Sequence, residues 1–111
     1  MASKLEIRVL AAERTQSDVI YRIMVEAPDR NQAFILPKTF EEFKALSLKL
    51  EESVPSTLPT FPSHWFWDWW VDRRPELIEK RQGELNTYVR ALSKLPRVKK
   101  SPIFLQFLQL N

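Results

Sequence analysis

The stretch PELIEKRQGELNTYVRALSKL, residues 75–95, predicts one long amphipathic helix from Glu76 to Leu95. Its apolar side chains recur every three or four residues, which is the spacing of one helical face. They are Leu77, Ile78, Leu85, Tyr88, Val89, Leu92 and Leu95. Arg81 stands in the middle of this face, where a hydrophobic residue is expected. A guanidinium keeps its proton and is costly to bury alone, so Arg81 should meet an internal carboxylate or line a pocket for an external anion. A structural salt bridge, or a side chain that reaches back to water, is the other interpretation.

The N-terminal third of the chain predicts strands. Apolar and polar residues alternate in Leu5–Val9 and again in Val19–Val25, as in half-buried strands. A turn-like segment, Ala27–Asn31, leads to a third strand at Gln32–Leu36. Pro37 is expected to end this strand, because proline cannot donate to a strand ladder. These segments predict a three-stranded antiparallel sheet.

Two further helices flank the long one. Thr39 is a candidate N-cap for a helix over Phe40–Glu52. The proline-rich segment Val54–Pro62 favours an extended crossover, and Ile103–Leu110 carries the apolar face of a last helix. The predicted fold class is therefore α+β: a three-stranded antiparallel β-sheet packed against a helical subdomain of three main helices with a proline-rich crossover. A chain of 111 residues predicts a single domain over residues 1–111.

Composition narrows the possible functions. The chain has no cysteine, one histidine and one glycine, so we expect no metal, no cofactor and no catalytic triad or phosphate loop. No apolar run has the length of a membrane span, and the N-terminus does not read as a signal peptide, which predicts a cytoplasmic protein. A net charge of +3 suits nucleic acid, anionic lipid or an acidic protein surface. The basic residues form no clear stripe, so nucleic acid is not the expected partner.

Four motifs, in this order and spacing, together resemble the phox homology (PX) domain. They are FEEF at residues 40–43, TLPTFP at 57–62, LIEKR at 77–81 and SPIFLQFL at 101–108. Within the family, the chain looks most like the short domains of sorting nexins and of a vacuolar SNARE. The resemblance implies a phosphoinositide reader, most often of phosphatidylinositol 3-phosphate on endosomal or vacuolar membranes.

The resemblance also implies which residues bind the headgroup. Arg81 falls on the arginine that grips the inositol hydroxyls, and Phe40 on the aromatic residue that flanks the inositol ring. Thr39 occupies the position of the arginine that holds the 3-phosphate, with Lys38 directly before it. His64 stands where a lysine follows the proline-rich segment, and it would contribute when protonated. The expected phosphoinositide site is thus Arg81, Lys38, Thr39, Phe40 and His64.

An aromatic segment follows the proline-rich crossover, with five aromatic side chains in the six residues Trp65–Trp70. No helix or strand can point all of them inward. In the family this region inserts into the membrane, and tryptophan favours the headgroup boundary. We expect Trp65, Phe66 and Trp67 to insert into the membrane and the later pair to pack. The alternatives are rings that cap the core and an aromatic patch that docks a protein.

Two functions follow from these patterns. The first is a non-enzymatic, phosphoinositide-binding module that targets a peripheral membrane protein to endosomal or vacuolar membranes, in membrane trafficking and protein transport. The second is a PX-like protein-interaction module that has lost specific phosphoinositide binding and docks a partner through its aromatic patch. The two differ at Arg81, whose replacement should abolish liposome binding in the first and spare partner binding in the second.

Overall fold

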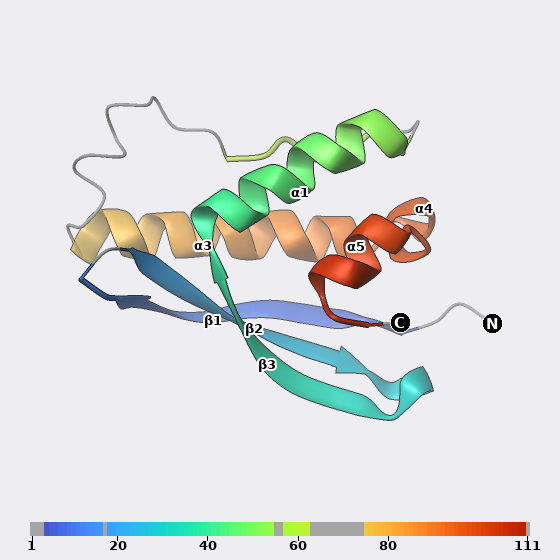
Figure 1. The fold of residues 1–111 in the computed structure, drawn as a ribbon, viewed down its shortest axis with the longest axis horizontal. Helices are drawn as coiled ribbons and strands as arrows, with labels where there is room; N and C mark the ends of the chain where they lie inside the picture. The colour runs from blue at the N-terminus through green and yellow to red at the C-terminus, as the bar shows by residue number, and fades with distance from the viewer. Residues whose placement is uncertain (1–3, 17, 55–56, 63–74, 111) are drawn as a thin grey trace.

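The structure is a computed structural model, and it describes residues 4–16, 18–54, 57–62 and 75–110. A three-stranded antiparallel sheet carries a layer of helices on one face (Figure 1), which confirms the predicted α+β class. The strands, in the order β1-β2-β3 across the sheet, are β1 (Glu6–Arg14), β2 (Val19–Ala27) and β3 (Gln32–Thr39). The described helices are α1 (Phe40–Ser53), α3 (Pro75–Ser93), α4 (Pro96–Lys99) and α5 (Pro102–Phe107), with a short 3-10 turn, η1 (Pro28–Arg30), between β2 and β3.

The alternation seen in the sequence sets which side of the sheet is buried. Ile7 pairs with Val25, and Ile23 pairs with Leu36; all four are buried under the helices. The β1–β2 register shifts between Val9 and Ala11, forming a bulge that leaves Leu10 exposed. A bulge opens part of the strand ladder, so the backbone there needs other partners.

Pro37 does not end the third strand, so that expectation is wrong. β3 continues to Thr39, with Pro37 opposite Arg22. The reason is that β3 lies at the edge of the sheet, where a strand has one unpaired side and tolerates a residue without an N–H. Lys38 and Thr39 are therefore strand residues that lead directly into α1.

One hydrophobic core joins the helices to the sheet. Its fully buried members include Phe43 and Leu50 from α1, Leu85 and Leu92 from α3, and Phe104 from α5. Burying a side chain of this size stabilises the fold by roughly 1.5–3 kcal/mol. No helix in the described part of the chain is long and apolar enough to cross a membrane.

A short helix follows α3. The long helix ends at Ser93, two residues before the expected Leu95, and Pro96–Lys99 forms the short helix α4. Proline at the first helical position favours such a turn because its φ angle is already helical and its missing N–H is not needed there.

Candidate functional site

Arg81 lies on the buried face of α3, and its residue is only 7% exposed. Its guanidinium carbon lies 4.0 Å from the centroid of the Phe40 ring, at the first residue of α1. A cation over an aromatic face is attracted by the ring quadrupole, and this attraction does not use the N–H donors of the guanidinium. The side chain that stands out in the sequence therefore lies where the first turn of α1 meets α3.

Three aromatic rings from three segments lie beside this arginine. The Phe40 and Phe61 centroids are 5.4 Å apart, and those of Phe61 and Tyr88 are 5.2 Å apart at an interplanar angle of 80°. Phe61, from the proline-rich segment, thus bridges α1 and α3. Burial, and to a lesser extent the nearby Glu51 carboxylate, raises the pKa of Tyr88 to about 12. The phenol is therefore neutral at physiological pH.

Two polar side chains fix α3 on the bulged strand. The Val9 N–H donates a hydrogen bond to Asn86 Oδ1 at 2.9 Å, and Gln82 Nε2 donates to the Leu10 carbonyl at 3.0 Å. They satisfy backbone groups at the bulge and so set the rotation of α3 relative to β1. That rotation presents Arg81 to Phe40. The sequence carries no signal for this role, because it depends on where the register shifts.

Thr39 is the N-cap of α1, as predicted. The Glu42 N–H donates to Thr39 Oγ1 at 3.2 Å, and the Thr39 N–H donates to Glu42 Oε1 at 2.9 Å. This reciprocal arrangement is a capping box, which the T-x-x-E spacing in the sequence already signals. The threonine hydroxyl is therefore engaged in the cap.

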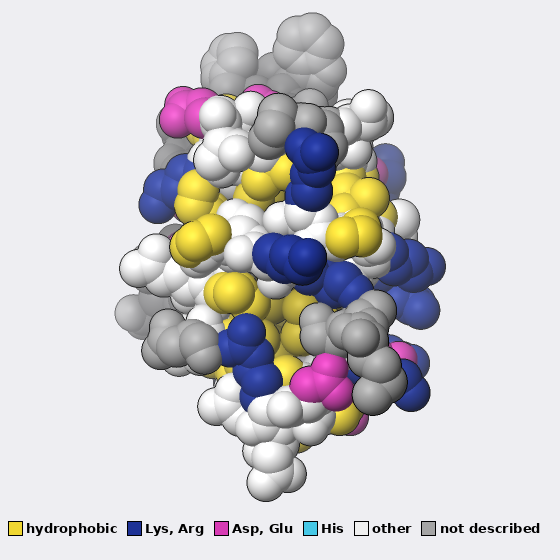
Figure 2. Space-filling view, turned by 90° about the vertical axis from the view of Figure 1, so that its right-hand side faces the viewer, with side chains coloured by type: hydrophobic (Ala, Val, Ile, Leu, Met, Phe, Trp, Pro, Cys, Tyr) yellow, Lys and Arg dark blue, Asp and Glu magenta, His cyan; other side chains and the backbone are white. Residues whose placement is uncertain are grey.

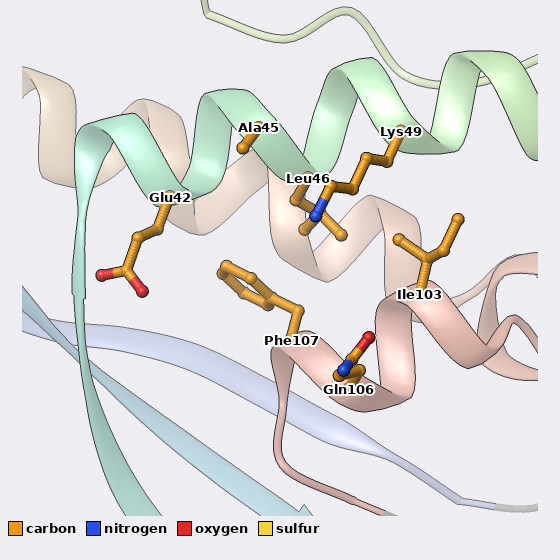
Figure 3. Close-up of a pocket in the computed structure, with 7 residues that line it drawn as sticks. All are labelled: Glu42, Ala45, Leu46, Lys49, Ile103, Gln106 and Phe107. Carbon is orange, nitrogen blue, oxygen red and sulfur yellow. The ribbon is translucent and has the colours of Figure 1, made fainter.

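Lys38 is also buried, at 8% exposure, but it faces another part of the fold. Its Nζ lies 3.7 Å from Glu42 Oε2 and 4.7 Å from the centroid of the Phe107 ring, which α5 supplies. Glu42 and Phe107 line a hollow of about 270 Å³ between α1 and α5 (Figure 3). The other lining residues are Ala45, Leu46, Lys49, Ile103 and Gln106. Lys38 thus lies beside the first turn of α1 and α5, whereas Arg81 reaches the first residue of α1 from α3.

The structure brings together part of the predicted site. Arg81 and Phe40 are in contact, Thr39 caps the helix that Phe40 begins, and Lys38 pairs with Glu42. His64, Trp65, Phe66 and Trp67 lie outside the described residues. The pairing of Glu42 with Lys38 has no signal in the sequence, because the i,i+4 rule holds for two residues of one helix and Lys38 belongs to β3.

On the end of the molecule that carries α4 and α5, the basic side chains of the described residues do not form a continuous stripe. Figure 2 shows that face, where lysine and arginine side chains are interspersed with hydrophobic ones. The exposed residues Arg97 and Lys100 belong to α4 and its C-cap.

These features define a small α+β domain in which a buried arginine of α3 contacts the first residue of α1. The model of the PX domain family matches residues 26–111, and the chain belongs to this family. PX domains are non-catalytic lipid-binding modules and in general target proteins to phosphoinositide membranes.

The comparisons also find similar proteins. The chain is 36% identical over 78 residues to the human phosphatidylinositol 4-phosphate 3-kinase C2 domain-containing subunit beta, an alignment that covers 69% of this chain and 5% of that protein. The chain therefore spans about 5% of the length of this relative.

Solved PX domains have the same fold. A designed CISK-PX domain superposes with a TM-score of 0.80 at 20% identity, covering 94% of this chain and 98% of that one. The mouse SNX19 PX domain with a bound sulphate ion has a TM-score of 0.67 at 18% identity, with coverage of 98% and 99%.

Proposed function

We propose that this chain recruits its protein to membranes by binding a phosphoinositide headgroup at Arg81 and Phe40. The observation that carries the proposal is a guanidinium with 7% exposure on the apolar face of α3, 4.0 Å from the ring that begins α1. A planar guanidinium binds phosphate and vicinal hydroxyl groups through paired donors, and a helix start adds partial positive charge. Family membership supports the same ligand class.

Each site residue has a proposed role. Arg81 grips the inositol hydroxyls, while the Phe40 ring flanks the inositol ring. Thr39 holds the start of α1 in place, and Lys38 and His64 supply further positive charge to the phosphates. The proposed lipid is phosphatidylinositol 3-phosphate on endosomal or vacuolar membranes, which the protein would reach from the cytoplasm as part of protein transport.

We propose that the aromatic segment strengthens this attachment. Trp65, Phe66 and Trp67 would insert at the headgroup boundary, where indole rings are stable with one edge in water and the other in hydrocarbon. Headgroup binding would then give specificity, and insertion would slow dissociation.

A second candidate is a protein-docking module that uses the aromatic patch. It is favoured by the engagement of two expected headgroup ligands elsewhere: the Thr39 hydroxyl caps α1, and the Lys38 ammonium pairs with Glu42. In this case, the family pocket would persist without its usual ligand.

Co-sedimentation with liposomes that each carry one phosphoinositide, at pH 6 and pH 7.4, separates the two candidates. Arg81→Gln is the test variant. Arg90→Gln is its control, since Arg90 is an exposed arginine of the same helix. Binding to one headgroup that is lost in Arg81→Gln and kept in Arg90→Gln supports the lipid reader. Binding unchanged by Arg81→Gln overturns it in favour of protein docking.

The comparison of the two pH values tests His64. Protonation of a histidine near its ordinary pKa of about 6.5 adds a positive charge at pH 6. We expect stronger binding at pH 6, and His64→Gln should abolish that difference. A pH effect that survives the substitution would remove His64 from the site.

A further inference from the structure

Glu42 has two carboxylate oxygens, and each has a different partner. Oε1 accepts the Thr39 N–H at 2.9 Å and completes the cap of α1. Oε2 lies 3.7 Å from the Lys38 ammonium. Figure 3 shows Glu42 extending from the first turn of α1 on the side of the helix where Phe107 also lies. The ion pair with Lys38 can therefore open while the cap of α1 stays in place.

The ion pair is loose. Its distance of 3.7 Å exceeds the roughly 2.7–3.2 Å of a direct hydrogen bond. The Glu42 side chain is 48% exposed, so water screens much of the attraction. A phosphate monoester carries a charge of about −1.5 to −2 and three acceptor oxygens, which makes it a stronger partner for an ammonium than one screened carboxylate.

Lys38 is close enough to serve the proposed headgroup site. It precedes Phe40 by two residues, which is about 7 Å of extended chain at most. Arg81 rests on the ring of that same Phe40. Two buried cations therefore flank the start of α1, and the four-carbon stem of Lys38 allows its ammonium to turn from one side of the helix start to the other.

We propose that Glu42 competes with the headgroup for Lys38 and thereby sets the affinity of the Arg81–Phe40 site for phosphorylated inositols. This inference rests on the proposed phosphoinositide function. Without a bound headgroup, Glu42 Oε2 neutralises Lys38 beside Phe107. A phosphate draws the ammonium away, while Oε1 still caps α1. Glu42 thus sets the affinity of the site, although it contacts no ligand itself.

The chain offers a matched pair of variants for the test. Glu42→Gln removes the charge that holds Lys38 and keeps a side chain able to complete a capping box. Glu41→Gln removes the same charge from the neighbouring residue of the first turn, which is exposed. Any general electrostatic gain toward an anionic membrane appears in both variants, whereas release of Lys38 appears only in the first.

Affinity is measured for neutral phosphatidylcholine vesicles with and without phosphatidylinositol 3-phosphate, and by calorimetry for soluble inositol 1,3-bisphosphate. We expect Glu42→Gln to bind both phosphorylated probes about fivefold more tightly, the equivalent of one screened ion pair. Glu41→Gln should change the affinity less than about twofold. In a Lys38→Met background, the gain from Glu42→Gln should disappear. Thermal unfolding of each variant checks that α1 is intact.

Three results would overturn the inference: equal gains from Glu41→Gln and Glu42→Gln, a gain that survives Lys38→Met, or a gain seen with vesicles but not with the soluble headgroup. Binding that Arg81→Gln abolishes and Glu42→Gln leaves unchanged would refute the competition while keeping the lipid function. Absence of binding to every phosphoinositide, in the wild-type chain and in Glu42→Gln alike, would refute the proposed function itself.

Discussion

Two cations are buried at the start of α1, and their surroundings differ. Arg81 approaches from α3 and rests on the face of Phe40 at 4.0 Å. Lys38 approaches from β3 and lies between the Glu42 carboxylate, at 3.7 Å, and the ring of Phe107, at 4.7 Å. Their exposures are nearly equal, at 7% and 8%. Burial alone therefore does not distinguish the two cations.

The difference lies in the nature of the partner. A ring face attracts a guanidinium without using its N–H donors, whereas a carboxylate neutralises an ammonium directly. The Glu42 carboxylate therefore competes with an external anion for Lys38, whereas the Phe40 ring does not compete with one for Arg81. The predictions below test this contrast, beginning with the largest expected effect.

Arg81→Met should weaken phosphoinositide binding by about 2–5 kcal/mol, one to several decades in Kd, because the headgroup loses a charged partner in a desolvated site. The free energy of unfolding should change by less than the binding free energy, since methionine keeps an unbranched apolar side chain on the buried face of α3. Lys38→Met should weaken binding less. Vesicle titration and thermal unfolding measure both quantities, and a fall in stability without a loss of binding would make Arg81 a structural residue.

Phe40→Leu and Phe107→Leu remove the two rings on which the cations rest. Each ring also packs against another phenylalanine, at 5.4 Å for Phe40–Phe61 and 5.3 Å for Phe43–Phe107, so the stability costs should be similar. Only Phe40→Leu should also lower headgroup affinity, by about 0.5–2 kcal/mol, the range of a cation–π contact. Vesicle titration measures the headgroup affinity of both variants. Equal losses of affinity would contradict a special role for Phe40.

Thr39→Ala should lower the free energy of unfolding by about 1 kcal/mol, because it leaves the Glu42 N–H at the start of α1 without its hydroxyl acceptor. Thr39→Ser keeps the acceptor and should restore most of this loss. Chemical denaturation of the three proteins gives the values. If Ser and Ala are equally destabilising, the cap is not the source of the effect.

Tyr88 provides a test at high pH. Its pKa rises from 10.0 to about 12 in the folded protein, so the neutral phenol stabilises the fold fully below pH 10. This contribution is lost as pH rises through the folded pKa, with a fall of about 1 kcal/mol once partial solvent screening is allowed for. Tyr88→Phe should remove this part of the alkaline destabilisation. Chemical denaturation between pH 9 and pH 12 measures the free energy of unfolding of both proteins. Identical pH profiles would rule out a contribution from Tyr88.

Much of the fold follows from local patterns. Apolar residues alternate along Val19–Val25, and they recur with the helical period along Glu76–Leu95. These spacings predicted β2 and α3, because side chains share a face every two residues in a strand and every 3.6 in a helix. Pro37 was misjudged because tolerance of a missing N–H depends on whether a strand lies at an edge, which is a property of the whole sheet. The bulge at Leu10 is likewise not signalled by the neighbouring sequence. The same is true of the hydrogen bonds that Gln82 and Asn86 make to the backbone there.

The sequence by itself determined that the chain is an α+β domain of the PX family and that Arg81 interrupts an apolar helical face. These properties depend on residue types at fixed spacings, which a sequence displays directly. Only the tertiary structure decided that Arg81 rests on Phe40, and that Lys38 is held beside Phe107 by a carboxylate that also caps α1. A long charged side chain has several partners within reach, and the packing of distant segments selects among them.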